Sequence, residues 1–250
     1  DLVIIGGVAA GMSAAAKARR INPDINIEVF TDEQYISYAG CGLPYFIGDK
    51  IRSKDRLLAR SIEQFMNQNI KVNTQTRVTD INKEDKTITA KNLVNGEVTT
   101  KSYDKLIIAT GARPVMPPLE GINLEGIFSL RTINDSLNIR DYFLKYKPQR
   151  AVIIGGGYIG LEMVENLLEY DCEITLIEQH SHIIPNMDED MAKVAHDYIT
   201  SQKVTIKTGE KVIKFEGQER VEKVITDKGV MEADFVLLSI GVQPNSELAK

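Results

Sequence analysis

Two segments far apart in the chain begin with the same pattern, and this repetition constrains the fold more than any other feature. Leu2-Val-Ile-Ile-Gly6 and Ala151-Val-Ile-Ile-Gly155 are each a short apolar run that ends in glycine. Such a run predicts a parallel strand that is buried on both faces. A helix and a further apolar strand are expected after each run, over 9–21 and 25–30 in the first half and over 158–170 and 173–177 in the second. The chain is therefore predicted to be α/β, with two Rossmann-like dinucleotide-binding domains.

Between the two units, the pattern changes to an alternation of polar and apolar residues. The alternating segments are 71–78, 87–92 and 97–102, with the hairpin dipeptide Asn95-Gly96 between the last two. We predict a small β-meander over about residues 71–103, inserted in the first domain and followed by a return strand over 105–109. The prolines at positions 114, 117 and 118 then indicate a linker, which gives a first domain over 1–120 and a second over 121–250.

The second half is expected to continue with a helix over about 188–201. Further strands are predicted near 204–206, 210–216, 221–226 and 235–239. A helix start over 246–250 coincides with the last residue of the chain. We therefore expect the sequence to be part of a longer natural unit.

Composition narrows the class of protein. Of the 250 residues 43% are apolar, and 35 acidic against 30 basic side chains give a net charge of −5, which argues against a nucleic-acid partner. The longest apolar stretch is interrupted by glycines and falls short of the roughly 20 residues of a membrane helix. The start at Asp1 lacks the basic opening of a secretory signal, and we expect a cytoplasmic protein without a membrane partner.

The cysteines and histidines give no metal-ligand or disulfide pattern. Cys41 and Cys172 lie far apart, so any cysteine chemistry must come from one thiol. Cys172 lies beside the start of a strand, and we interpret it as a buried structural residue. The three histidines, His180, His182 and His196, are interpreted as surface residues, and no metal site is expected.

The second glycine turn carries a complete G-x-G-x-x-G motif between a buried strand and a helix. Gly155 would allow the tight turn, Gly157 would let a pyrophosphate approach the backbone, and Gly160 would allow close packing of helix and strand. The helix start offers free N–H groups to phosphates. Glu178 ends the next strand. An acid at this position accepts a hydrogen bond from a ribose 2′-hydroxyl and repels a 2′-phosphate. The motif therefore predicts a nicotinamide dinucleotide site that favours NADH over NADPH.

The first glycine turn is imperfect. Gly6 and Gly11 hold the outer positions, but Val8 stands where the middle glycine belongs. The acidic residue that would bind the ribose at the end of the second strand is either displaced by one residue to Asp32 or replaced by the hydroxyl of Thr31. A plain strand-to-helix turn without a nucleotide stays open as an alternative.

The segment Ser37-Tyr-Ala-Gly-Cys41-Gly-Leu-Pro-Tyr45 places glycines on both sides of a thiol. A cysteine close to a helix start faces the positive end of the helix dipole, which favours the thiolate. From this segment alone, a buried structural cysteine remains the stronger alternative. At the end of the first predicted helix, Lys17, Arg19 and Arg20 complement the dipole, and this role competes with phosphate binding.

Taken together, these motifs resemble the flavin-dependent pyridine nucleotide-disulfide oxidoreductases of the single-cysteine group, and most of all the coenzyme A-disulfide reductases. The matching segments occur in order along the whole chain: both glycine turns, 37–45, 109–114, Leu161-Glu162, 186–191 and 241–245. The resemblance implies FAD on the first unit, a nicotinamide cofactor on the second, and Cys41 as the redox thiol beside the flavin. It also implies Tyr158 as a gate over the nicotinamide site and Glu162 near the carboxamide.

The family pattern assigns further residues to each ligand. The resemblance, together with the glycine turns, gives as cofactor-binding residues Gly6, Gly7, Val8, Ala9, Ala10, Gly11, Thr31, Asp32, Val78, Ala109, Thr110, Gly111, Gly155, Gly156, Gly157, Tyr158, Ile159, Gly160, Glu162, Glu178 and Gly241. The residues that match coenzyme A contacts are Ser13, Lys17, Arg20 and Ser37. Family members continue into a last FAD segment and a dimerisation domain, and a homodimer is expected for the full-length protein.

Two departures from the family pattern bear on the substrate. Gly40 replaces the family's asparagine before the cysteine, which leaves coenzyme A disulfide open against a persulfide or polysulfide. Ala9 replaces the histidine that related NADH oxidases and peroxidases carry, so oxygen reduction has less local support. The expected function is reduction of coenzyme A disulfide through Cys41. The alternatives are persulfide or polysulfide reduction, NADH oxidation, and a non-catalytic dinucleotide-binding remnant.

Overall fold

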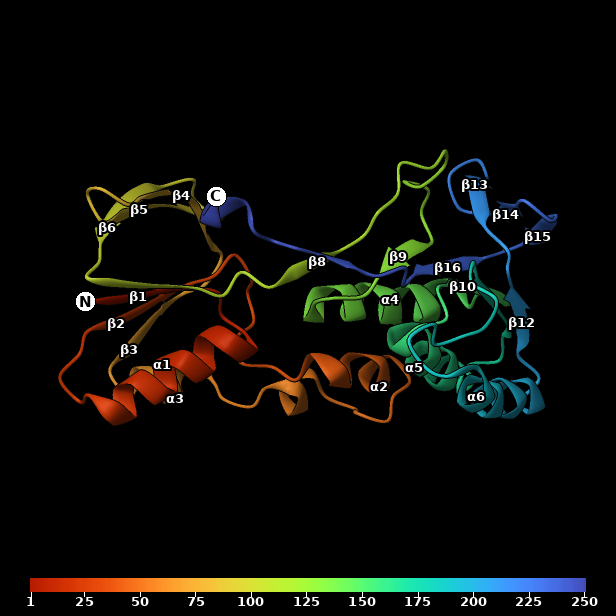
Figure 1. Ribbon diagram of the computed structural model, residues 1–250, viewed down its shortest axis with the longest axis horizontal. Coiled ribbons are helices and arrows are strands. Elements are labelled where there is room, and N and C mark those ends of the chain that lie inside the picture. The colour runs from red at the N-terminus through yellow and green to blue at the C-terminus, as the bar shows by residue number, and fades with distance from the viewer. The chain divides into compact units, whose positions relative to one another are not determined.

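The computed structural model describes residues 1–250, which form two compact units (Figure 1). Unit 1 comprises Asp1–Ala39, Lys54–Ala112 and Pro244–Lys250, and unit 2 comprises Gly40–Ser53 and Arg113–Gln243. This division differs from the expected boundary at residue 120 in two respects. It falls near Ala112, and it assigns the cysteine segment to the second unit, because the helix of that segment packs against two helices of unit 2. No helix in the structure has both the length and the apolar character needed to cross a membrane.

Unit 1 is built on a parallel sheet in the order β3-β2-β1-β7. Its elements are β1 (Leu2–Ile5), α1 (Ala9–Ile21), β2 (Ile27–Phe30), η2 (Lys54–Leu57), α3 (Ile62–Met66), β3 (Ile70–Asn73), β4 (Thr76–Asn82), β5 (Thr87–Asn92), β6 (Val98–Ser102), β7 (Lys105–Ile108) and η3 (Glu247–Ala249). Every residue of β1 and β2 is buried, as the continuous apolar runs predicted. The first helix has the predicted bounds.

The predicted meander was wrong at its start. The segment read as one alternating strand over 71–78 is two strands, because the chain turns at Gln75, whose φ is 48°. The first strand, β3, pairs in parallel with β2 and belongs to the main sheet. The antiparallel meander therefore consists of β4, β5 and β6 only.

Unit 2 is built on a second parallel sheet in the order β12-β11-β10-β16-β9. Its elements are η1 (Gly40–Gly42), α2 (Leu43–Ile47), β9 (Ile127–Ser129), α4 (Ile133–Tyr146), β10 (Arg150–Ile154), α5 (Tyr158–Leu167), β11 (Glu173–Glu178), α6 (Glu189–Ser201), β12 (Thr205–Thr208), β13 (Val212–Glu216), β14 (Lys223–Thr226), β15 (Val230–Glu232) and β16 (Phe235–Leu238). Two further short strands, β8 (Ala112–Pro114) and β17 (Val242–Pro244), pair with each other.

The internal repeat extends further than the sequence indicated. In unit 2, β13, β14 and β15 form an antiparallel meander directly before β16, just as β4, β5 and β6 precede β7 in unit 1. Both halves therefore follow one plan: a strand, a helix and a strand, a third parallel strand, a three-stranded meander, and a last strand that returns beside the first. The short β15 was not predicted.

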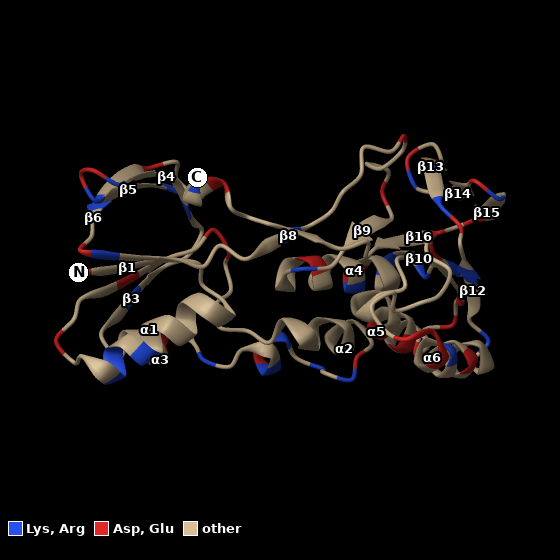
Figure 2. Ribbon diagram, viewed as in Figure 1, with Lys and Arg blue, Asp and Glu red and all other residues tan.

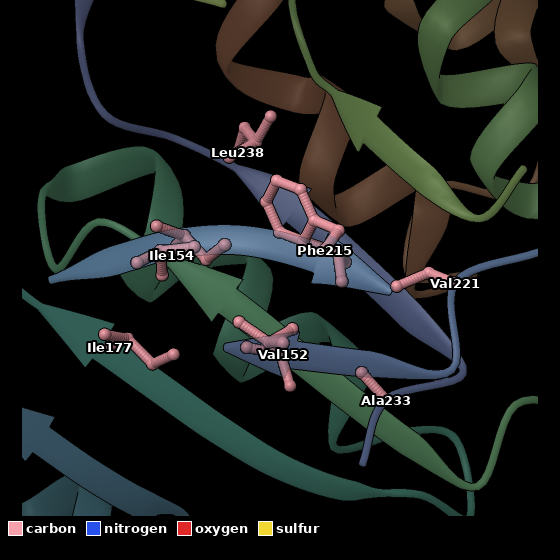
Figure 3. Close-up of a cluster of buried hydrophobic side chains, with 10 residues drawn as sticks. Val152, Ile154, Ile177, Phe215, Val221, Ala233 and Leu238 are labelled. Carbon is pink, nitrogen blue, oxygen red and sulfur yellow. The ribbon is translucent and has the colours of Figure 1, made fainter. Parts of the chain in front are cut away.

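The core of unit 2 lies between its parallel sheet and its meander. Figure 3 shows Val152 and Ile154 of β10, Ile177 of β11 and Leu238 of β16 on the face of the sheet that Phe215 of β13 covers. Phe215 is 2% exposed. Burial of a side chain of this size contributes about 1.5–3 kcal/mol to stability. This packing fixes the ends of β10, β11 and β16 relative to one another.

The helix α4 was missed by the sequence analysis, although its start carries a recognisable signal. Thr132 and Asp135 form a capping box, in which each side chain accepts a hydrogen bond from the backbone N–H of the other residue. The other face of the sheet in unit 2 is covered by this helix, and Phe143 packs edge-on against Phe235 with ring centroids 4.8 Å apart. The α4 helix therefore supports the sheet on the side opposite the meander.

Candidate functional site

In the second glycine turn, the two outer glycines and the middle glycine have different surroundings. Gly155 has a φ of +106°, and a Cβ there would lie 2.4 Å from the carbonyl oxygen of Ser239. A Cβ on Gly160 would lie 2.1 Å from the carbonyl oxygen of Gly155. A Cβ on Gly157 would meet nothing within 4 Å. The turn therefore requires glycine at position 155, and the close packing of helix and strand requires glycine at position 160. At Gly157 the backbone is not covered by a side chain and faces open space.

The helix that starts at this turn has no cap of its own. The N-cap residue of α5 is Gly157, which has no side chain to accept a backbone N–H, and the first turn contains no acid. By contrast, α3 and α4 both begin with a complete capping box. The first N–H groups of a helix need an acceptor or water. The start of α5 is therefore an acceptor-poor site that suits an anion such as a phosphate.

A cavity of about 550 Å³ lies in unit 2 at the carboxyl ends of β10, β11 and β16. The predicted cofactor-binding residues that line it are Gly155, Gly157, Tyr158, Ile159, Glu178 and Gly241. Ligands of open α/β sheets bind at this end of the strands. The bare Gly157 backbone, the uncapped helix start and the buried acid in one cavity fit a dinucleotide.

Three predicted residues, Gly156, Gly160 and Glu162, do not line this cavity. Gly156 faces Ile183 and the side chain of Glu178, and Gly160 lies against the turn. Glu162 is half-buried on α5, and burial raises the pKa of its carboxyl, with a smaller contribution from Glu165. These residues are placed beside the cavity wall rather than in it.

Glu178 is held by groups of unit 2 itself. It is 5% exposed, its Oε2 accepts from the backbone N–H of Gly156 at 2.7 Å, and its Oε1 accepts from the backbone N–H of His180 at 2.8 Å. The ring Nδ1 of His180 lies 2.6 Å from the same Oε1. His180 is exposed at the surface, as predicted, but its ring also contacts the acid and lines the cavity. Its position two residues after the strand-end acid was the available signal.

The other two histidines and Tyr158 are placed differently from His180. His182 and His196 are half-buried, and the ring of His182 bonds the carbonyl of Ile183. Tyr158, predicted as a gate, has a side chain that is largely exposed at the cavity mouth, and its hydroxyl accepts from Asn186 at 3.4 Å.

The first glycine turn in unit 1 repeats the outer features of the second. Gly6 has a φ of +122°, and a Cβ there would lie 2.1 Å from the carbonyl oxygen of Ala109. A Cβ on Gly11 would lie 1.9 Å from the carbonyl oxygen of Gly6. Val8 is the N-cap residue of α1 and makes no side-chain cap, and the first turn, with Ala9 and Ala10, contains no acid. An uncapped helix start therefore follows this turn as well, which fits a second dinucleotide phosphate.

The two candidates for the first ribose partner lie in different environments. Thr31 is buried beneath Gly7, and its Oγ1 accepts from the backbone N–H of Glu33 at 3.3 Å. Asp32 is about half exposed and pairs with Nε of Arg77 at 3.2 Å. The hydroxyl is thus engaged under the turn, whereas the carboxylate lies at the surface with a cation beside it.

The remaining predicted residues of unit 1 lie at the ends of its strands. The side chain of Val78 is buried between the sheet and the meander, next to an irregular register in β4. Ala109, Thr110 and Gly111 follow β7, and the Thr110 hydroxyl donates to the carbonyl of Asn245 at 2.6 Å. Val78 can therefore contact a ligand through its backbone alone, while the segment after β7 is fixed in place beside the first glycine turn.

The candidate thiol lies in a short segment that is held firmly in unit 2. Cys41 is exposed within the single turn η1, directly before the five-residue helix α2. The carbonyl of Ile47 accepts from the Tyr170 hydroxyl at 2.6 Å, and the carbonyl of Phe46 accepts from Arg140 at 3.1 Å. These bonds satisfy the end of α2 and attach it to the rest of unit 2. The exposed thiol thus has a fixed support.

The second cysteine has the opposite character. Cys172 is half-buried, and its Sγ lies 3.8 Å from the carbonyl oxygen of Leu167. Burial raises the pKa of the Cys172 thiol to about 11, with a smaller contribution from Asp171. A thiol with so high a pKa is a poor nucleophile at neutral pH. The structure therefore agrees with the structural role predicted for it.

The residues matched to coenzyme A contacts lie in unit 1. Ser13, Lys17 and Arg20 are exposed on α1, which carries basic and no acidic side chains (Figure 2). Neither Lys17 nor Arg20 has an ion-pair partner, whereas Arg19 is engaged by the carbonyls of Pro23 and Asn69. Ser37 has a φ of 50°, and its backbone N–H donates to the carbonyl of Gly7 at 2.8 Å. The two cations are free to meet an anionic ligand.

Comparison with known proteins gives one consistent answer. The family model of the pyridine nucleotide-disulphide oxidoreductases matches residues 1–250. An NAD(P)H coenzyme A polysulfide/persulfide reductase of Pyrococcus horikoshii is 36% identical over 251 residues, which are 100% of this chain and 55% of that protein. An NADH oxidase of Methanocaldococcus jannaschii is 34% identical over 250 residues, which are 99% of this chain and 56% of that protein.

A solved structure shows the same fold. Reduced Bacillus anthracis CoADR-RHD superposes with a TM-score of 0.96 at 39% sequence identity, over 99% of this chain and 45% of that one. The chain spans about half the length of the curated relatives it matches.

The contrast between two glycines of the second turn is directly testable. We expect Gly157→Ala to leave stability within about 0.5 kcal/mol of the wild type, because its Cβ meets no atom and its φ of −81° suits alanine. The methyl group should nevertheless lower NAD⁺ affinity at least tenfold by keeping a pyrophosphate off the backbone. Gly160→Ala should instead destabilise the protein by about 1–3 kcal/mol, because its Cβ collides with a carbonyl oxygen. Denaturant unfolding and calorimetric titration measure the two effects, and a Gly157→Ala variant that binds NAD⁺ normally would contradict the assignment.

The two thiols should differ strongly in reactivity. At pH 8, iodoacetamide is expected to label Cys41 and spare Cys172, because a pKa of about 11 leaves only about one part in a thousand of Cys172 as thiolate. Mass spectrometry of the digested protein measures labelling at each site against time. Equal labelling rates would show that the burial of Cys172 does not protect it.

Proposed function

The chain belongs to the pyridine nucleotide-disulphide oxidoreductase family, and we propose that it carries both dinucleotide sites and the redox thiol of an FAD-dependent NAD(P)H:disulfide oxidoreductase. The observation that carries this proposal is the cavity of unit 2, where a bare glycine backbone, an uncapped helix start and a buried acid meet. The exposed Cys41 supplies the second chemical requirement, a nucleophilic thiol. The homodimer expected of the complete protein remains part of the proposal.

In this proposal, the residues of each unit have separate tasks. The backbone N–H groups at the start of α5 bind the pyrophosphate of the nicotinamide dinucleotide, and Glu178 accepts from its adenosine ribose. The first glycine turn and the start of α1 bind the phosphates of FAD in the same way. When bound, FAD supplies the two electrons, taken from the reduced nicotinamide, that return a cysteine mixed disulfide to the thiol.

Cys41 carries the covalent step. Its thiolate attacks one sulfur of a disulfide substrate, so that a bond forms between Cys41 Sγ and that sulfur while the original S–S bond breaks. The first half of the substrate leaves as a thiolate and takes up a proton. Two electrons then break the mixed disulfide, which restores the Cys41 thiolate and releases the second half. The net reaction converts one disulfide, one NAD(P)H and one proton into two thiols and NAD(P)⁺.

Coenzyme A disulfide is the substrate that the exposed cations of α1 favour. Lys17 and Arg20 lie three residues apart and Ser13 one turn earlier, so they share one side of the helix, and both cations lack an acidic partner. Such a pair suits the phosphates of coenzyme A. Of the cofactors, NADH is favoured over NADPH, because Glu178 would repel a 2′-phosphate.

A persulfide or polysulfide substrate is the second candidate, and Gly40 favours it. A Cβ on Gly40 would meet nothing within 4 Å, so the backbone would tolerate the family's asparagine there. The absence of that side chain leaves the space beside Cys41 open to a small sulfur substrate. Ala9 is not a proton donor, and NADH oxidation therefore ranks third, ahead only of a non-catalytic role.

Replacement of the thiol tests the function itself. In Cys41→Ser we expect NADH-dependent flavin reduction to persist while disulfide turnover falls about 1,000-fold or more, because a hydroxyl is not a nucleophile at neutral pH. Stopped-flow reduction and a steady-state disulfide assay separate the two steps. The matched variant Cys172→Ser should keep both activities. Disulfide turnover that survives in Cys41→Ser would show that Cys41 is structural, and the absence of flavin from the wild-type protein would favour the non-catalytic alternative.

Removal of the two cations tests the substrate. Lys17→Ala combined with Arg20→Ala should raise the KM for coenzyme A disulfide about tenfold, while the KM for polysulfide stays unchanged. The matched control is Lys91→Ala with Lys228→Ala, which removes the same charge from exposed sites elsewhere. Equal changes for both substrates, or none for either, would mean that these cations only complement the end of α1.

A further inference from the structure

The ribose-binding acid of unit 2 has almost no free acceptor capacity. An ionised carboxylate offers about four acceptor positions. In Glu178, three of them are occupied: one on Oε2 by the N–H of Gly156, and two on Oε1 by the backbone N–H and the ring of His180. One position on Oε2 therefore remains for an incoming ribose hydroxyl. A ribose that presents two hydroxyl groups to this acid needs one of the three internal partners to leave.

Of the three partners, the imidazole ring is the one that can leave. The N–H of Gly156 is fixed because that residue packs against Ile183 and its carbonyl accepts from Ile184. The backbone of His180 is fixed on both sides, since its N–H donates to Glu178 and its carbonyl accepts from Gly209 at 2.7 Å. The His180 side chain, however, is 55% exposed, whereas that of Glu178 is 6% exposed. A rotation about its side-chain bonds is enough to take the ring off the acid.

The position of the ring also changes what the cavity offers to a phosphate. With the ring on Oε1, an N–H group offsets the negative charge of Glu178. With the ring displaced, the carboxylate faces the cavity without that partner. The second acid of this wall, Glu210, is buried, accepts from the Thr226 hydroxyl at 2.6 Å and has Lys207 at 3.9 Å. Lys211 supplies a cation in the same wall, so Glu178 is the group that decides against a phosphate.

We propose that His180 is a specificity-determining residue, whose ring competes with the adenosine ribose for Glu178 and thereby relaxes the discrimination between NADH and NADPH. With the ring on the acid, the cavity accepts a 2′-phosphate more readily. With the ring displaced, Glu178 accepts hydrogen bonds from both hydroxyl groups of the adenosine ribose of NADH. This inference rests on the proposed function of the cavity as the nicotinamide dinucleotide site.

Removal of the ring should therefore have opposite effects on the two cofactors. In His180→Ala we expect NAD⁺ to bind at least threefold more tightly and NADP⁺ at least threefold more weakly, a change of about tenfold in their affinity ratio. His180→Leu keeps bulk and loses the donor, and it should give the same shift, so the test does not depend on one variant. His180→Asn places an amide N–H near the position of Nδ1 and should restore the wild-type ratio.

A neighbouring histidine provides the matched control. The ring of His182 bonds the carbonyl of Ile183 and does not line the cavity, so His182→Ala should leave both affinities unchanged. Isothermal titration of each variant with NAD⁺ and NADP⁺ gives the affinities without requiring turnover. A thermal unfolding midpoint for each variant shows that it is folded.

The outcomes separate the inference from the function on which it rests. A folded wild-type protein that binds neither dinucleotide would refute the proposed function of the cavity. A wild-type protein that binds one or both, with an affinity ratio that His180→Ala and His180→Leu leave unchanged, would overturn the role of His180. Opposite shifts in the two affinities, restored by His180→Asn, are the result that this role requires.

Discussion

The close approach of a helix start to the end of a buried strand is the constraint on which the rest of the structure depends. At Gly155 and Gly160 the helix and strand backbones leave no space for a side chain, because a Cβ on either would lie within 2.4 Å of a carbonyl oxygen. The same geometry aims the first N–H groups of α5 at a cavity in which no residue caps them. Two other helices, α3 and α4, begin with side-chain caps, which Ser61 and Thr132 provide. The tight turn therefore leaves these N–H groups without a side-chain acceptor, and a phosphate could fill this role.

The chain contains this arrangement twice, each time with a meander before the returning strand, and the two copies differ at the glycine turn and at the end of the next strand. In unit 2 the middle position of the turn is the bare Gly157, and the next strand ends in the buried Glu178. In unit 1 the corresponding positions are Val8 and the buried Thr31, followed by the exposed Asp32. The first copy therefore has an uncapped helix start but no buried acid at the end of the strand that follows the helix.

The sequence predicted the parts of the structure that local patterns determine. The helix over 9–21, the fully buried strands and the glycine geometry follow from periodicity and from the absence of a Cβ. The residues 71–78 were misread because β3 and β4 share one alternating pattern, and only the turn at Gln75 separates them. The support of α2 by Tyr170 and Arg140 joins residues about a hundred positions apart, which no local pattern reveals. The bond from His180 to Glu178 needed the turn after β11 to be known.

The central claim is that the backbone at the start of α5 binds the pyrophosphate of a nicotinamide dinucleotide. Amide NMR spectra of the isotope-labelled protein, recorded while ADP-ribose is added, test it most directly. Saturable shifts are expected at the N–H groups of Gly157, Tyr158 and Ile159, with the amides of the first turn at Gly7 and Val8 unchanged. Shifts at the first turn alone, or a saturating ligand that moves none of the three α5 amides, would contradict it.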